Sequence, residues 1–247
     1  MLKKYFKQIF IMIFLIFSVV LTAEDNFMAV GNIKIVRPEP LLIKREDLNI
    51  TIEKDSTIKV ESMYTFSNLG EYNIKSTFMF WLDQIRENDN KDPNNSNKNN
   101  KGKYIKNIKF YSDYKKSQNL RAVIKFDENI YENQSAGNIQ REWFAISKTI
   151  PSKEEGKLGV YYDLQNTGFN RTKKFVYSFD LVSNFSEKNK AEILYINVYN
   201  KSGRKIDSIV YKDYEFKNLT GKKSDKEHYE LLVANVNLDE KLVINFK

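Results

Sequence analysis

The chain has 247 residues, a formal net charge of +8 and no cysteine. The lack of cysteine excludes disulfides, thiol catalysis and thiolate metal sites, so packing alone has to stabilise the folded chain. Aromatic residues make up 14% of the chain, which has only 9 glycines and 4 prolines. This composition is typical of a folded protein whose strands are joined by polar turns, and not of a linker or a collagen-like chain.

The N-terminus is typical of a secretory signal peptide. Three lysines precede an apolar run over residues 9–21. This run is shorter than the roughly 20 apolar residues that a membrane-spanning helix needs. We therefore predict a signal peptide over residues 1–23, with cleavage after Ala23. The mature chain, residues 24–247, is then exported to the periplasm or the cell surface and has no stable membrane span. An uncleaved N-terminal anchor is the alternative.

The charge of the mature chain argues against nucleic acid as a partner. Three of the positive charges lie in the signal peptide, which leaves +5 on the mature chain. The remaining basic residues come as scattered doublets and form no dense patch, and an exported protein does not meet nucleic acid in its compartment. Long-range attraction could still draw such a surface weakly to an anionic envelope polymer. We therefore expect the partner to be an envelope protein or polymer.

Alternation with a period of two is the strongest pattern in the chain. Over residues 57–68, one strand face carries apolar Ile58, Val60, Tyr64 and Phe66, and the other carries polar residues. The same period recurs in residues 122–126, 175–181 and 242–246. No amphipathic helix of useful length separates these segments. The pattern predicts an all-β fold, an antiparallel β-sandwich built as one large unit or two small ones, and not a parallel α/β sheet.

Two polar turns predict β-hairpins. Ser202-Gly203 lies between residues 191–200 and 205–211, and this pair can adopt the positive φ angles of a tight turn. Asn68-Leu69-Gly70 similarly separates the strand that ends at Phe66 from the apolar run 74–82. Each pair of strands is expected to be antiparallel neighbours.

Residues 87–103 form a polar segment that is nearly free of apolar side chains. Such a segment cannot offset the entropy of ordering itself, so we expect a disordered loop inserted in one sandwich rather than a linker between two. Its alternating oxygen-bearing residues resemble a calcium loop. Pro93 occupies the position of the EF-hand glycine, however, and Asn99 that of the bidentate glutamate, so no metal site is predicted at Asn88, Asn90, Asp92 and Asn94.

His228 is the only histidine of the chain. One histidine cannot build a typical zinc site, and no nucleophile near it in the sequence gives it a role as a general base. We therefore interpret it as a surface or strand-entry residue. The chain also lacks the G-x-S-x-G, Walker and dinucleotide glycine patterns. No catalytic, cofactor-binding or metal-binding residue is assigned, and no cofactor is expected.

Paired acids and tryptophans offer a weaker hint of carbohydrate chemistry. A glycosidase needs two carboxylates at a fixed distance across a sugar-binding cleft. Adjacent acids on a strand point to opposite faces, so the four acidic pairs are interpreted as solvated: Glu46-Asp47, Asp127-Glu128, Glu154-Glu155 and Asp239-Glu240. Trp81 and Trp143 could stack on sugars, but each lies in an apolar strand, and core packing is the favoured interpretation.

Three segments together resemble a known family. Residues 45–82 contain a strand that begins with an acidic residue followed by Asp and Leu, and then a strand that ends in Phe-x-Asn. A polar turn and a strand that ends in Phe-x-Phe follow. The segments REWFAISKTIPSKEEGKLGVYYDLQNTG and HYELLVANVNLDEKLVINF fit the same outline. This order resembles the exported bacterial family known as domain of unknown function DUF4424, although Trp81 stands near the place where that family tends to have proline. The resemblance implies a β-sandwich envelope protein without established activity, and it carries over no functional residue.

Three functional classes follow from these observations. The first is a non-enzymatic exported protein, a binding or structural β-sandwich whose loops, sheet faces or edge strands bind a partner. The second is a small outer-membrane β-barrel, which the many charges on the strand faces disfavour. The third is a carbohydrate-active enzyme with a carboxylate pair. We favour the first class.

Overall fold

A computed structural model describes residues 29–31, 34–35, 39–86, 105–113, 119–120, 124–129, 138–164, 173–179, 190–221 and 226–247. No helix in these ranges is long and apolar enough to cross a membrane. The predicted signal peptide, its cleavage site and the polar loop 87–103, with its four alternating oxygen-bearing residues, lie outside the described residues.

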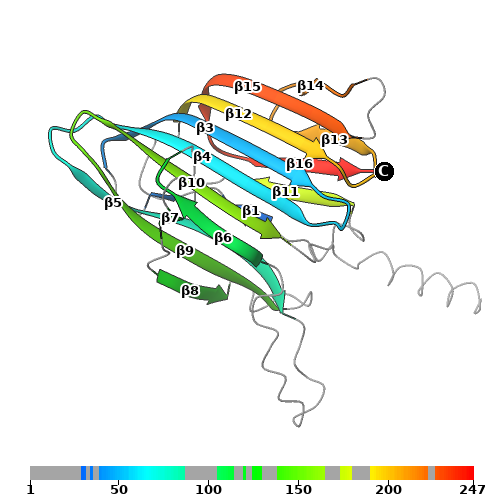
Figure 1. The fold of residues 1–247 in the computed structure, drawn as a ribbon, viewed down its shortest axis with the longest axis horizontal. Helices are drawn as coiled ribbons and strands as arrows, with labels where there is room; N and C mark the ends of the chain where they lie inside the picture. The colour runs from blue at the N-terminus through cyan, green and yellow to red at the C-terminus, as the bar shows by residue number, and fades with distance from the viewer. Residues whose placement is uncertain are drawn as a thin grey trace, which may run out of the picture.

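The strands form two open sheets that face each other (Figure 1). Sheet A has the order β13 (Ile206–Val210), β16 (Lys241–Phe246), β11 (Lys174–Ser178), β1 (Ala29–Gly31), β5 (Ile74–Arg86), β9 (Asn138–Ile150) and β8 (Ile124–Asn129), and β2 (Lys34–Ile35) also pairs with β5. Sheet B has the order β14 (Lys217–Asn218), β15 (Glu227–Asn237), β12 (Lys190–Asn200), β3 (Leu41–Ile52), β4 (Ile58–Asn68), β10 (Glu155–Leu164), β6 (Ile105–Tyr111) and β7 (Asn119–Leu120). The predicted all-β sandwich is confirmed. Most pairs are antiparallel, and β1–β11 and β3–β12 are parallel.

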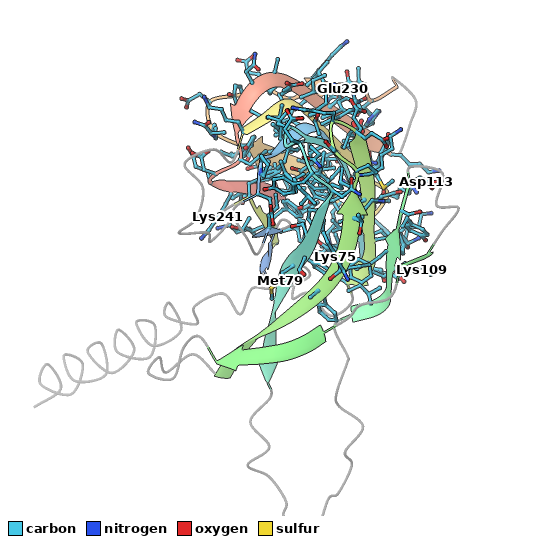
Figure 2. The ribbon with its side chains drawn as sticks, turned by 90° about the vertical axis from the view of Figure 1, so that its left-hand side faces the viewer. Lys75, Met79, Lys109, Asp113, Glu230 and Lys241 are labelled. Atoms are coloured by element: carbon cyan, nitrogen blue, oxygen red, sulfur yellow. The ribbon has the colours of Figure 1, made fainter. Side chains whose placement is uncertain are left out.

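Alternate side chains of both sheets meet in one aromatic core. Phe66 of β4 in sheet B lies 4.8 Å from Phe78 of β5 in sheet A, measured between ring centroids. Phe80 of β5 contacts Phe110 of β6 at 5.4 Å and Tyr162 of β10 at 5.9 Å. Figure 2 shows the drawn side chains filling the space between the two sheets and also projecting from their outer faces. The face predicted for residues 57–68 is therefore the buried one.

Strands on both sides of residues 87–103 belong to the same sheets. In sheet A, β5 precedes this segment and pairs with β9, which follows it. In sheet B, β4 pairs in the same way with β10. The short strand β1 lies between β11 and β5, and so joins the two parts of sheet A.

Both predicted hairpins are wrong, because each turn carries the chain from one sheet to the other. β4 lies in sheet B and β5 in sheet A, and likewise β12 lies in sheet B and β13 in sheet A. The turn chemistry itself is present, since Gly203 has a φ of 82°. A polar turn reverses the chain direction, but it does not determine whether the next strand pairs with the previous one or packs across the core from it.

The corner between β4 and β5 is organised by one buried asparagine. Asn68 is 1% exposed, and its Nδ2 donates to the carbonyl oxygens of Tyr72 (2.8 Å), Ile150 (3.1 Å) and Pro151 (2.9 Å). Its Oδ1 accepts a hydrogen bond from the Gly70 amide at 2.8 Å. Ile150 and Pro151 belong to the neighbouring corner between β9 and β10. Asn68 therefore ties both sheet-changing corners together.

A polar cluster is buried within the core. Glu46 of β3 is fully buried, and so are three tyrosines around it, Tyr64, Tyr162 and Tyr177. The Tyr177 hydroxyl shares a hydrogen bond of 3.1 Å with the Ser62 Oγ. Burial raises the pKa of all three tyrosines well above 10, and the Glu46 charge adds to this effect. These three tyrosine hydroxyls therefore stay protonated in the folded core.

We predict that Asn68→Ala lowers the free energy of unfolding by about 2 to 4 kcal/mol, because several buried backbone groups lose their partner at once. Asn73→Ala is the matched control at the same corner, where the exposed Asn73 accepts one hydrogen bond from the Ser152 amide at 3.0 Å. Its cost should stay below about 1 kcal/mol. Urea denaturation measures both values, and equal losses would show that Asn68 does not organise the corner.

We also predict that the protein loses stability as the pH rises above about 10, the pKa of an unburied tyrosine. Above that value the unfolded chain releases tyrosine protons that the folded state retains, so the free energy of unfolding falls with increasing pH. Tyr177→Phe should weaken this dependence, whereas Tyr72→Phe, at a side chain that is 57% exposed, is the control. Denaturation at pH 8 to about 11 tests this, and phenolate absorbance without unfolding near pH 10 from the buried tyrosines would contradict it.

Candidate binding surface

His228 lies on the outer face of sheet B and is oriented by its neighbours. Its ring stacks on Tyr199 of β12 with centroids 4.3 Å apart, and its Nε2 lies 3.0 Å from the Asn197 Oδ1. The Asn197 Nδ2 donates to the Asn49 Oδ1 at 3.1 Å. Because the Asn197 oxygen can only accept, the His228 Nε2 is the donor. These partners make His228 part of a network on the sheet surface.

The network continues along the same face. The Tyr195 hydroxyl donates to the Glu230 Oε2 at 2.6 Å, and this hydrogen bond raises the pKa of Tyr195. The Arg45 guanidinium lies 5.8 Å from the Tyr195 ring centroid, and its Nε donates to both carboxylate oxygens of Asp47 at 2.8 Å. We call this set the polar surface: Arg45, Asp47, Asn49, Tyr195, Asn197, Tyr199, His228 and Glu230. Its groups are largely bonded to each other.

The structure separates the acids of two predicted pairs. Glu46 is buried in the core, whereas Asp47 lies on the outer face beside Arg45, as strand alternation requires. Glu155 forms an exposed ion pair with Lys44 at 2.8 Å, and its neighbour Glu154 is exposed. In neither pair do the two carboxylates face each other across a cleft.

The remaining two acidic pairs lie at other edges of the fold. Asp239 and Glu240 are exposed between β15 and β16, and Asp239 pairs with Lys212. Asp127 and Glu128 are neighbours on β8, where they are in register with Glu142 and Arg141 of β9. Within the described ranges, the His, Asp and Glu side chains form no group of three or more that could hold a metal ion.

The two tryptophans come together in sheet A. Trp81 of β5 and Trp143 of β9 are directly opposite each other in the register, and Phe126 of β8 is opposite Trp143. We call these three residues the aromatic row. They come from three strands that are adjacent in the sheet, of which β8 and β9 are also consecutive in the sequence.

The backbone register assigns the positions of the aromatic row to the opposite face of sheet A from Phe80 and Phe144. Phe80 packs against sheet B and stacks on Phe144 at 5.3 Å, so these two residues mark the inward face. Trp81 follows Phe80, Trp143 precedes Phe144, and the register between β5 and β9 has no irregularity. Successive residues of a strand occupy opposite faces. The side chains of Trp81 and Trp143 lie outside the described part of the structure, so the core packing favoured for them stays a prediction.

Two further rows flank the aromatic row on this face. On one side, Met79, Ala145 and Ile124 are in register, and Ala145 is only 1% exposed. On the other side, Asp83, Arg141 and Glu128 are in register. The sequence analysis missed Phe126 and both flanking rows. Period-two alternation within each strand could have grouped the residues of one face, but only the register aligns them across three strands.

No protein-family model and no curated protein matches the chain. Among solved structures, it is similar to a candidate nutrient binding protein from Legionella pneumophila, with a TM-score of 0.61, 12% sequence identity and coverage of 89% of this chain and 73% of that protein. It also matches an M1 zinc metallopeptidase from Deinococcus radiodurans, with a TM-score of 0.41, 11% identity and coverage of 83% of this chain and 42% of that protein. A candidate protease from Parabacteroides distasonis matches with a TM-score of 0.42, 5% identity and coverage of 83% of this chain and 40% of that protein. The two peptidase scores are too low to carry an argument. The likeness to the Legionella protein shows a shared fold.

Proposed function

We propose that the protein is an exported, non-enzymatic binding module of the cell envelope, located in the periplasm or at the cell surface. Its binding surface is the outward face of sheet A at β5, β9 and β8. The observation that carries the proposal is the aromatic row, in which Trp81, Trp143 and Phe126 are in register.

Aromatic residues at one place on a sheet face favour a binding role. Tryptophan combines a large apolar surface with a polar N–H, and it is enriched among the residues that contribute most to binding energy. Both tryptophans of the chain lie at this single register position.

The placement of the acids supports binding rather than catalysis. The carboxylates of the Glu46-Asp47 pair lie on opposite sides of sheet B, and Glu155 is engaged by Lys44. Glycoside hydrolysis needs two carboxyl groups that flank one bond. The similarity in fold to a candidate nutrient binding protein from Legionella agrees with a binding role, but at 12% identity the proposal rests on the aromatic row. Membership of the DUF4424 family is part of the same proposal and rests on the sequence segments described above.

The binding role predicts that Trp81→Ala and Trp143→Ala reduce retention of the purified mature protein on washed envelope fractions by at least about tenfold. Trp81→Phe should keep most of the retention, because it preserves an aromatic ring in the row. Tyr195→Ala, on the outer face of sheet B, is the matched control and should bind like the wild type. Circular dichroism and urea denaturation verify that each variant is folded. Undiminished retention of both tryptophan-to-alanine variants would overturn the proposed surface.

Export is tested in the same preparation. The protein recovered from fractionated cells is expected to begin at Glu24 when its N-terminus is sequenced, and to be released without detergent. A retained Met1, or a protein that only detergent releases, would contradict export to a soluble compartment.

A further inference from the structure

We propose that the segment from β1 to β2, residues 29–35, is an exchangeable arm, and that two copies of this chain dimerise by each placing its arm in sheet A of the other. The partner surface is the seam between β11 and β5, which the arm fills. This inference goes beyond the proposed function and does not depend on it, because an exchanged arm leaves β5, β9 and β8 in place.

The arm joins two parts of sheet A that have no other pairing in the described chain. β1 pairs in parallel with β11, from Ala29 opposite Val176 to Gly31 opposite Ser178. On its other side β1 pairs in antiparallel with β5. Among the described strands, β11 and β5 do not pair with each other. Without an arm in the seam, sheet A would therefore have two unpaired edges in its middle, where a strand can add.

The arm continues along β5 beyond β1. Val30 is in register with Leu82, and β2 pairs with the same strand through Lys34 opposite Met79 and Ile35 opposite Phe78. Both β1 and β2 are antiparallel to β5, so the arm follows β5 over this length. The side chain of Ile35 is partly buried and packs against the core. The arm is thus held by backbone pairing on both sides and by one apolar anchor.

The arm contributes little to the core. The buried hydrophobic residues of the described chain run from Ile43 to Phe246, so all of them follow the arm in the sequence. The packing of Phe66 against Phe78, at 4.8 Å between ring centroids, joins the two sheets without the arm. The arm can therefore leave the seam while the core strands stay connected and packed.

A second copy of this chain is the occupant that fits the seam. Its residues 29–35 offer β11 and β5 the same backbone groups and the same isoleucine anchor. Exchange of an identical element keeps the contacts of the monomer, which makes it a low-cost route to a dimer.

The linker behind the arm also favours exchange. Only five residues, 36–40, join β2 in sheet A to β3 in sheet B, and two of them are Pro38 and Pro40. Proline fixes its φ angle, so this linker has few conformations that return the arm to its own chain. Short and restricted hinges are the ones that promote exchange between copies.

Engineered cysteines test the exchange, because the chain has none of its own. Lys34 and Met79, the latter labelled in Figure 2, are opposite each other on β2 and β5, at a spacing that a disulfide can bridge. The full mature variants Lys34→Cys and Met79→Cys carry different affinity tags. They are unfolded together in urea, refolded at high protein concentration and oxidised with glutathione disulfide. We expect a disulfide-linked pair that contains both tags.

Tyr72→Cys is the matched control for Met79→Cys, because the Tyr72 side chain is 57% exposed at the corner between β4 and β5. Mixed with Lys34→Cys, it should give at least about fivefold less linked pair, because it lies away from the arm's register. A chain that carries both Lys34→Cys and Met79→Cys is refolded at low concentration and oxidised. Its own disulfide holds the arm in place, so we expect it to remain a monomer when it is concentrated.

Light scattering gives the mass of the wild type over a range of concentrations. We expect a dimer whose fraction rises with concentration. A wild type that is monomeric at every concentration overturns the inference and leaves a strand of another protein as the only exchange partner. A dimer in which Met79→Cys links to Lys34→Cys no more than Tyr72→Cys does also overturns it, because the copies then associate through another surface.

Discussion

The burial of alternate side chains between two facing sheets is the constraint on which the rest of this structure depends. Phe66, Phe78 and Phe80 pack across the interface, and each fixes which face of its strand points inward. Once Phe80 is inward, a regular register assigns its neighbour Trp81 to the outward face. The core therefore determines which residues occupy the other face of the same strands.

The corners between β4 and β5, β9 and β10, and β12 and β13 allow this packing, because each sends the chain from one sheet into the other. Asn200 ends β12 as Asn68 ends β4: it is 2% exposed, its Oδ1 accepts from the Ser202 amide, and its Nδ2 donates to the Arg204 carbonyl. A buried amide satisfies the backbone groups that a change of sheet would otherwise leave without partners. The first described residues, Ala29–Gly31, add the strand that joins both parts of sheet A. The expected cleavage after Ala23 would leave this strand on the mature chain.

Strands and buried faces could be predicted from sequence wherever one face was clearly apolar, as in residues 57–68 and 242–246. The connections could not, because Asn68-Leu69-Gly70 and Ser202-Gly203 are good turns whether the next strand pairs beside the last one or crosses the core. The buried face of residues 74–82 was harder to assign from the sequence. Residues 74–82 are apolar on both faces beyond Thr77, so periodicity grouped Phe78 with Phe80 and Met79 with Trp81 but could not choose the buried set. The polar surface and aromatic row needed cross-strand register, which one sequence does not contain.

The central claim is the proposal that Trp81 and Trp143 belong to a face of sheet A that a ligand can reach. Acrylamide quenching of tryptophan fluorescence in the mature protein tests it most directly, with the urea-unfolded protein as the reference for full access. The account predicts substantial quenching of the folded protein, and protection when a bound ligand covers the aromatic row. Emission that resists quenching in the folded, ligand-free protein and becomes accessible only on unfolding would place the tryptophans in the interior and contradict the account.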